Sequence, residues 1–293
     1  MSTTYSRRSA DDSGRTAHPM REGVLAGCAV VMAHPDDEIL WASSVLGRAG
    51  RVVLCFGPVA GAPHLGPARG RVLAAFPLGP VEFLALPEAG VLDRADWSDP
   101  RPTAAGLALG SQLLPEHPGA IADYAVNHAR LCAELTTRLA GVSEVVTHNP
   151  WGEYGHEEHV QVLRAVEAAQ AVHGFRVWVT AYIAPKSLPL MLAERHRIGP
   201  ATPPLPTDRP LAERLKALYA AEGCWTWGED YLWPETERFF RLQPADSPAG
   251  PSTALPLNVL PRAANRPPPL AALGRRLRRK LRLRSRLRGL RGS

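Results

Sequence analysis

The chain has 293 residues, with 34 Lys and Arg side chains against 28 Asp and Glu side chains, which gives a formal net charge of +6. Ten of the basic side chains, and no acidic one, lie in residues 270–293, so residues 1–269 carry 24 basic and 28 acidic side chains. No run approaches the ~18–20 apolar residues of a membrane-spanning helix. The four cysteines are scattered, which argues against a disulfide framework or a thiolate zinc finger. We therefore expect a cytoplasmic protein with one sizeable core.

Residues 1–22 lack apolar periodicity and a signal-peptide core, and they are predicted to be a flexible leader. A domain is expected at residues 23–242. It holds five short apolar runs, typical of strands buried on both faces of a parallel sheet: residues 28–33, 51–56, 81–86, 143–148 and 175–183. Helical patterns occupy residues 38–48, 121–140, 157–172, 187–196 and 207–222. This alternation predicts an α/β, Rossmann-like three-layer fold with a mostly parallel sheet and an active site at the C-terminal ends of the strands.

The connections of this domain differ in character. Gly- and Pro-rich residues 57–70 and 87–119 follow two predicted strands, where they form either the rim of a substrate site or surface insertions. An aromatic segment, residues 225–240, closes the domain. Residues 243–269 are rich in Pro and Ala and are predicted to be an extended linker.

The first polar motif is Ala-His-Pro-Asp-Asp-Glu at residues 33–38, where the first predicted strand ends and a helix begins. Proline suits a first helical turn because its missing N–H would have no partner there. The carboxylates of Asp36 and Asp37 then lie near a helix N-terminus, where the peptide dipoles favour negative charge. The motif places these two carboxylates and the His34 imidazole above the sheet, although a charged helix cap would show the same pattern.

The second motif, residues 148–159, follows the fourth predicted strand and reads His-Asn-Pro-Trp-Gly-Glu-Tyr-Gly-His-Glu-Glu-His. His156 and His159 would share one face of a helix that begins there. Imidazoles and carboxylates suit zinc and other divalent first-row ions. Because parallel strands deliver their carboxyl ends to the same edge of a sheet, the two motifs are predicted to converge on one metal ion.

Together, AHPDDE after one apolar strand and GEYGHxxH after a later one resemble the LmbE-like/PIG-L superfamily of metal-dependent de-N-acetylases, over about residues 28–240. Members of that superfamily remove acetyl groups from N-acetylglucosamine units of glycolipid, thiol-cofactor, antibiotic and oligosaccharide precursors. The resemblance implies three metal ligands and three catalytic residues. The ligands are His34, Asp37 and His159, and the catalytic residues are Asp36 as general base, His156 as general acid or electrophilic partner, and Tyr154 as the group that polarises the acyl oxygen.

The chain departs from the family pattern in two places. Many relatives have His-Pro-Asp-His where this chain has residues 156–159, so Glu158 replaces an Asp that orients or tunes the neighbouring His. Residues 69–75 read RGRVLAA and lack the acid of the family's Arg-containing helix, so no substrate-binding Arg is carried over.

These observations predict a zinc-dependent hydrolase that removes the N-acetyl group from an N-acetylglucosamine-type sugar conjugate, with Fe²⁺ as the alternative metal. Three protein ligands leave a coordination position for water, whose pKa zinc lowers to about 7. Two alternatives stay open: a metal-dependent amidase that acts on a thiol-sugar conjugate, and a catalytically silent relative that binds sugars.

His148 and Trp151 lie in the second motif, and residues 270–293 form a basic C-terminal tail. His148 is expected to hydrogen-bond its own loop rather than act as a fourth ligand, and Trp151 is the favoured tryptophan to line the site. In residues 270–293, leucines recur at helical spacing between arginines, which is typical of helices on an anionic membrane surface. Peripheral attachment to the inner face of the membrane and a solvated basic tail both remain open. Nucleic-acid binding is not expected, because the tail lacks aromatic residues and the rest of the chain is acidic.

Overall fold

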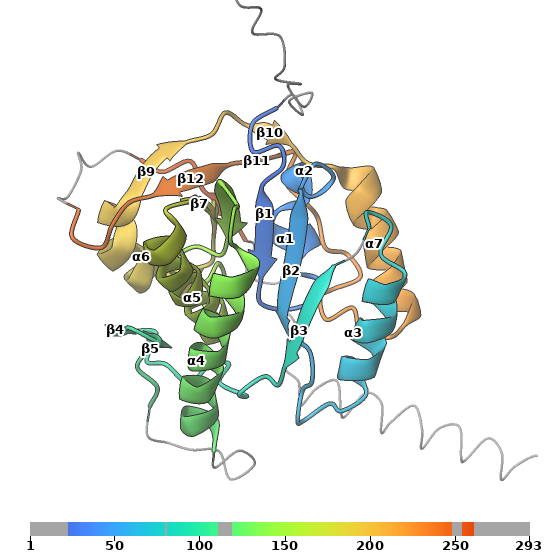
Figure 1. Cartoon of the computed structure of the whole chain (residues 1–293), viewed down its shortest axis with the longest axis horizontal. Helices are drawn as coiled ribbons and strands as arrows, with labels where there is room; N and C mark the ends of the chain where they lie inside the picture. The colour runs from blue at the N-terminus through green and yellow to red at the C-terminus, as the bar shows by residue number, and fades with distance from the viewer. Residues whose placement is uncertain (1–22, 80, 111–118, 248–253, 261–293) are drawn as a thin grey trace, which may run out of the picture.

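The computed structural model describes residues 23–79, 81–110, 119–247 and 254–260. Its centre is a seven-stranded sheet with the strand order β3-β2-β1-β6-β7-β12-β9 (Figure 1). These strands are β1 (Ala29–Met32), β2 (Arg51–Phe56), β3 (Glu82–Leu86), β6 (Glu144–Thr147), β7 (Arg176–Thr180), β9 (Ile198–Ala201) and β12 (Phe239–Leu242). The strands from β3 to β7 in this order run parallel, whereas β12 is antiparallel to both β7 and β9. The predicted mostly parallel sheet is confirmed.

Helices cover both faces of the sheet, with α4 and α5 on one face and α1, α2, α3 and α7 on the other (Figure 1). The helices are α1 (Asp37–Trp41), α2 (Ser43–Leu46), α3 (Leu65–Ala74), α4 (Ala120–Arg138), α5 (Glu157–His173), α6 (Leu188–Glu194) and α7 (Arg209–Ala221), with 3-10 turns at Pro185–Ser187 and Arg195–Arg197. Three short strand pairs are β4 (Pro102–Thr103) with β5 (Gly106–Leu107), β10 (Leu205–Pro206) with β11 (Thr236–Glu237), and β8 (Tyr182–Ile183) with β13 (Asn258–Val259). The three-layer α/β architecture agrees with the sequence prediction.

The central strand β1 explains why the apolar runs are continuous. Val30 and Met32 lie in the core beneath α1 and α7, whereas Ala29 and Val31 lie in the core beneath α4 and α5. Each of the four side chains is at most 1% exposed. A strand that is covered on both faces has no position for a polar side chain, so its sequence cannot alternate.

Two local structures differ from the sequence prediction. The Gly- and Pro-rich residues 57–70 contain the first part of α3, whose buried positions Leu65, Ala68 and Val72 are spaced as one helical face. Gly and Pro inside this helix hid that face, because both residues are poor helix formers. The helix expected at residues 38–48 is interrupted at Ala42, where φ is −141°, and therefore forms α1 and α2.

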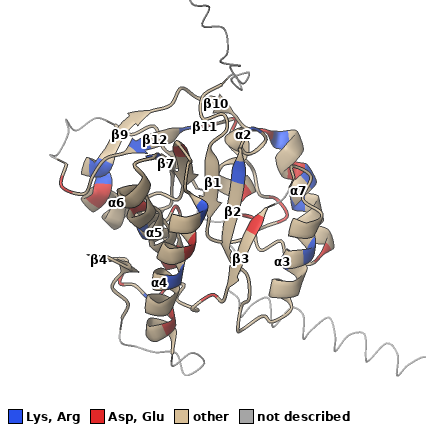
Figure 2. Ribbon diagram, viewed as in Figure 1, with Lys and Arg blue, Asp and Glu red and all other residues tan. Residues whose placement is uncertain are grey.

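The predicted leader, residues 1–22, and the predicted tail, residues 270–293, lie outside the described residues. Within the predicted linker, Asn258 and Val259 form β13 and pair in parallel with β8, so this part lies against the domain instead of extending away from it. None of the described helices is long and apolar enough to cross a membrane. Figure 2 shows acidic and basic residues interspersed along α4 and α7, as on solvated helix faces.

Candidate functional site

The two polar motifs meet where the direction of the sheet's connections reverses. β1 and β6 are neighbours, but the chain continues from β1 to β2 on one side and from β6 to β7 on the other. In open α/β sheets, ligands bind beyond the carboxyl ends of the strands at such a switch point. His34 follows β1 by two residues, and His148 directly follows β6. The sheet topology therefore brings together two motifs that are more than a hundred residues apart.

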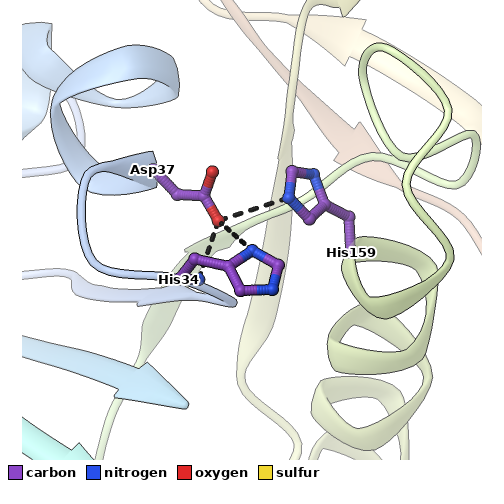
Figure 3. Close-up of side chains that lie close together, drawn as sticks. All are labelled: His34, Asp37 and His159. Carbon is purple, nitrogen blue, oxygen red and sulfur yellow. Dashed lines mark hydrogen bonds and ion pairs between the residues drawn. The ribbon is translucent and has the colours of Figure 1, made fainter. Parts of the chain in front are cut away.

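The three predicted metal ligands form one buried cluster (Figure 3). Asp37 Oδ2 lies 3.2 Å from His34 Nδ1 and 3.3 Å from His159 Nε2. The ligand atoms of the three residues all lie within 4.8 Å of one another. Asp37 is itself fixed, because its Oδ1 accepts a hydrogen bond from Trp41 Nε1 at 2.8 Å and its Oδ2 accepts one from the backbone N–H of His34 at 2.8 Å.

A hydrogen bond to Glu153 sets the tautomer of His159. Its Nδ1 lies 2.7 Å from Glu153 Oε2, and since a carboxylate only accepts, this nitrogen carries the proton. When His159 is neutral, as a metal-binding imidazole must be, its unprotonated Nε2 faces Asp37. That Nε2 is buried, and among the described residues it has no partner in hydrogen-bonding geometry. Such an orphaned nitrogen is what a cation would satisfy.

The electrostatics of the cluster also fit a cation. Burial alone lowers the pKa of an imidazole, but the carboxylates of Glu88, Asp37 and Glu158 raise the pKa of His34 to about 10. Burial likewise opposes protonation of His159, and the carboxylates of Asp37 and Glu153 raise its pKa to about 9. In the metal-free protein, the surrounding carboxylates therefore favour positive charge on the two imidazoles, and a bound divalent ion would supply that positive charge instead. Two imidazoles and one carboxylate suit zinc or another first-row ion.

Glu153, which the sequence analysis did not single out, organises the second motif. Its Oε2 accepts hydrogen bonds from His159 and from His148 Nδ1, the latter at 3.0 Å, and its Oε1 accepts one from the backbone N–H of Asn149 at 3.0 Å. Burial raises its pKa, but these two histidines outweigh burial and hold the pKa at about 2. Glu153 also has a left-handed backbone, with φ of 50°. In the sequence, Glu153 is the one acidic residue between His148 and His156, and this position is the feature that could have identified it as a partner of the histidines.

His148 makes the loop contacts expected of it. Its Nδ1 donates to Glu153, so its Nε2 is free to accept, and it does so from the backbone N–H of Ala33 at 2.8 Å. Both ring nitrogens are thus occupied by protein groups, and His148 links the end of β6 to the end of β1. It positions the cluster without being available as a fourth ligand.

Glu158 contacts a different histidine from the one expected of the family's Asp. Its Oε2 lies 3.0 Å from His34 Nε2, and its Oε1 accepts the backbone N–H of Ala89 at 2.7 Å. The Glu158 carboxylate does not bond to His156; only the backbone N–H of Glu158 does, and it donates to His156 Nδ1 at 3.2 Å. Each of the two imidazoles of the cluster therefore has a buried carboxylate behind it, Glu158 for His34 and Glu153 for His159. Carboxylates in this position fix the orientation of metal-binding histidines.

His156 and Tyr154 lie beside the cluster. The ring of His156 is 4.7 Å from both the His34 and the His159 rings, and it caps the N-terminus of α5 through Nδ1. Because Nδ1 accepts there, the neutral ring carries its proton on Nε2. Burial, with His159 and His34 close by, lowers the pKa of His156 well below its usual value. Tyr154 lies 5.7 Å from His156, ring to ring, and none of the described residues hydrogen-bonds to its hydroxyl.

Asp36 is 2% exposed and has an unusual backbone, with φ of 110° and ψ of −20°. Its N–H donates to Glu38 Oε2 at 2.9 Å, and its Oδ2 accepts the hydroxyl of Thr226 at 2.7 Å. Burial first, and then the neighbouring Asp37 carboxylate, raise the pKa of Asp36 to about 7. Strained backbone and perturbed acidity of this kind concentrate at functional sites.

The tryptophan prediction is wrong. Trp151 is fully buried among Val160, Leu190 and other core residues, and its Nε1 donates to the Tyr182 carbonyl at 2.7 Å. Trp227 packs in the core beside α1, and its ring lies 5.2 Å from the ring of Tyr154. The Tyr182 carbonyl satisfies the indole N–H of Trp151 inside the core, and the sequence alone does not predict this hydrogen bond.

No protein-family model and no curated protein sequence matches the chain. Three similar solved structures are a deacetylase–teicoplanin complex from teicoplanin biosynthesis (14% identity, 74% of this chain, 98% of that chain, TM-score 0.44), the zinc-inhibited form of teicoplanin deacetylase Orf2 (13%, 73%, 97%, 0.48) and the A40926 pseudoaglycone deacetylase Dbv21 (14%, 74%, 97%, 0.40). All three are deacetylases.

Proposed function

We propose that the chain is a zinc-dependent N-deacetylase that hydrolyses the N-acetyl group of an N-acetylglucosamine-type sugar conjugate. The observation that carries this proposal is the buried cluster of His34, Asp37 and His159, directly beside Asp36, in which His159 Nε2 makes no hydrogen bond to any of the described residues. The family resemblance supports the same reaction. Fe²⁺ remains the alternative metal, because the same ligand types suit it.

The ion would be held by the three clustered side chains, with Glu158 and Glu153 behind the two imidazoles. When bound, zinc supplies a water of low pKa and polarises an acyl oxygen. The chain contributes the rest of the chemistry: it orients the ligands, holds and moves the proton, and donates hydrogen bonds to the oxygen on which charge develops.

Asp36 is proposed as the general base. Thr226 occupies its Oδ2, and among the described residues no group hydrogen-bonds to Oδ1, so one oxygen is fixed while the other is available to accept the proton of the attacking water. A pKa near 7 allows the carboxylate both to accept this proton and to release it again near neutral pH. The proton can then pass to the nitrogen as the C–N bond breaks, which yields acetate and a free amine.

His156 and Tyr154 are proposed to stabilise the acyl oxygen. The available donors are the Nε2–H of neutral His156 and the hydroxyl of Tyr154, whose ring lies beside the His156 and His159 rings and whose hydroxyl makes no hydrogen bond to the described residues. Removing one such donor from an oxyanion typically costs about 3 kcal/mol of transition-state stabilisation. Of the two roles that the resemblance left open for His156, its neutral form favours the electrophilic partner.

The substrate and location belong to the same proposal. The presence of ligands, base and donors in one site argues against a silent sugar-binding role, whereas a thiol-sugar conjugate would use the same groups and is separated from other N-acetylated conjugates by the substrate panel. A cytoplasmic location, and attachment of residues 270–293 to an anionic membrane surface, remain proposals, since those residues lie outside the described part of the chain.

The test is acetate release from a panel of N-acetylhexosamine conjugates by protein that has been stripped of metal and then reloaded with Zn²⁺ or Fe²⁺. We expect release only from reloaded protein. Asp36→Asn should lower turnover by about 10²- to 10⁴-fold, the usual contribution of a general base, while the metal content stays at one ion. Equal turnover by the Asn variant would refute the assignment of the base, and an absence of acetate from every reloaded sample would refute the deacetylase.

A further inference from the structure

Thr226 contacts the proposed base from a distant part of the chain. It lies 190 residues after Asp36, in the segment of residues 224–233 that follows α7, and its hydroxyl donates to Asp36 Oδ2 at 2.7 Å. We propose that Thr226 is a positioning residue for catalysis: it holds one carboxylate oxygen of Asp36 so that the other faces the reacting water. This inference rests on the proposed deacetylase function.

Asp36 needs such a partner, because its other contacts fix only its backbone. Its N–H is bonded to Glu38 Oε2, and Glu38 Oε1 in turn accepts the Tyr219 hydroxyl at 2.8 Å. Among the described residues, Thr226 is the one hydrogen-bond donor to the Asp36 carboxylate. Without that donor, the backbone would stay anchored while the carboxylate could rotate. Proton transfer depends on the position of the accepting oxygen, so this rotation would slow the reaction.

The segment that carries Thr226 is rigidly attached to the helix that follows Asp36. Trp227 packs edge-on against Trp41 of α1, with ring centroids 5.3 Å apart. Trp233 Nε1 donates to the carbonyl of Ile39, also in α1, at 2.6 Å. Thr226 and Asp36 therefore belong to one packed unit. Because the Thr226 hydroxyl cannot move along with the Asp36 carboxylate, its hydrogen bond can hold that side chain in one rotamer.

A second set of contacts holds the segment from its outer side. Lys216 of α7 donates to the carbonyl of Glu229 at 2.7 Å, and its ammonium group lies 5.6 Å from the Trp225 ring and 5.5 Å from the Trp233 ring. Cation–π contacts of this kind stabilise the packing of aromatic side chains. Thr226 is therefore placed between an indole that faces α7 and an indole that faces α1.

The proposal is tested with Thr226→Val, which removes the hydroxyl at nearly constant volume, and Thr226→Ser, which restores it. Thr226→Ala is the second hydroxyl-free variant in case Val packs poorly. The matched control is Thr207→Val, since Thr207 Oγ1 is buried without a hydrogen-bond partner among the described residues. A hydrogen bond to a charged group corresponds to about a 10- to 100-fold effect. We expect Val and Ala to lower kcat by that factor with unchanged KM and metal content, and Ser to restore kcat to within about 3-fold of the wild type.

A second measurement does not depend on activity. In metal-free protein labelled with ¹³C at the Asp carboxyls, the Asp36 resonance should move in Thr226→Val and stay in place in Thr226→Ser and Thr207→Val. A wild-type kcat in Thr226→Val overturns the proposal, and a rise in KM alone would make Thr226 a substrate contact instead. If the wild type releases no acetate from any conjugate, the proposed function fails. The carboxyl resonance then still decides whether Thr226 holds Asp36.

Discussion

Replacement of Glu153 by Gln probes the group that links both strand ends to the metal cluster. Four donors converge on this carboxylate: the Nδ1–H groups of His148 and His159 on Oε2, and the Asn149 N–H and the Thr180 hydroxyl on Oε1. Gln has an acceptor on one side and an NH₂ donor on the other. In either orientation, at least one N–H that was paired in the wild type faces another donor.

The Glu153→Gln substitution is expected to have two effects, a loss of folding stability and a loss of zinc affinity. If the NH₂ faces the histidines, His159 must move its proton to Nε2, the nitrogen that would bind the ion. His148 cannot change tautomer as readily, because its Nε2 accepts the Ala33 N–H. An unpaired buried group costs about 1–3 kcal/mol, so one or two such groups should lower the free energy of unfolding by about 1–6 kcal/mol. Loss of the carboxylate behind a metal-binding histidine should weaken zinc binding by about 10- to 100-fold.

Zinc titration by calorimetry and urea unfolding of the metal-free protein measure the two effects separately. Glu157→Gln is the matched control: Glu157 is equally buried and accepts the N–H groups of Arg94 and Ala95, but its side chain bonds to none of the described histidines. The control should lose stability and keep its zinc affinity. If Glu153→Gln binds zinc as tightly as the wild type, the tautomer reasoning is refuted.

The acid stability of the metal-free protein offers a check on the same carboxylate. The folded-state pKa of Glu153 is about 2, below the ordinary value of 4.5. A depressed pKa means that Glu153 contributes its stabilisation above about pH 4.5 and loses it as the pH falls toward 2. The shift corresponds to about 3 kcal/mol. This part of the pH dependence should be absent in Glu153→Gln, and an unchanged acid profile would contradict the low pKa.

Two other substitutions address the neighbours of the cluster. Trp41→Phe removes the donor to Asp37 Oδ1 and should weaken zinc binding by about 10-fold, measured by competition with a chelating indicator, whereas Trp178→Phe, whose indole bonds to the remote Glu144, should not. Equal affinities in the two variants would show that Trp41 does not orient Asp37. Glu158→Asp shortens the side chain by one methylene, so it cannot span from Ala89 N–H to His34 Nε2, and the same assay should show about 10-fold weaker binding. Undiminished affinity would mean that Glu158 does not act through His34.

The fold and the His34, Asp37 and His159 cluster could be predicted from the sequence because both follow from local sequence patterns. The continuous apolar runs located the parallel strands, and strand order then brought His34 and His159 together. The contacts of Glu153 and Thr226 could not be predicted in the same way. Each depends on how a loop or a late segment packs against α1 or β6, and no periodicity in the sequence encodes that packing. Helix α3 was missed for a local reason, since its Gly and Pro residues obscured a genuine apolar face.

The position of Thr226 along the chain has a consequence for synthesis on the ribosome. All three proposed ligands have been translated by residue 159, as has the base itself, whereas the hydroxyl that holds the base is added dozens of residues later. The residues of the proposed metal site therefore precede, in the order of synthesis, the group that is proposed to align Asp36. A chain shortened before residue 224 would retain the three ligand residues in its sequence, but it would lack Thr226, the core side chains Trp227 and Trp233, and strand β12 of the central sheet.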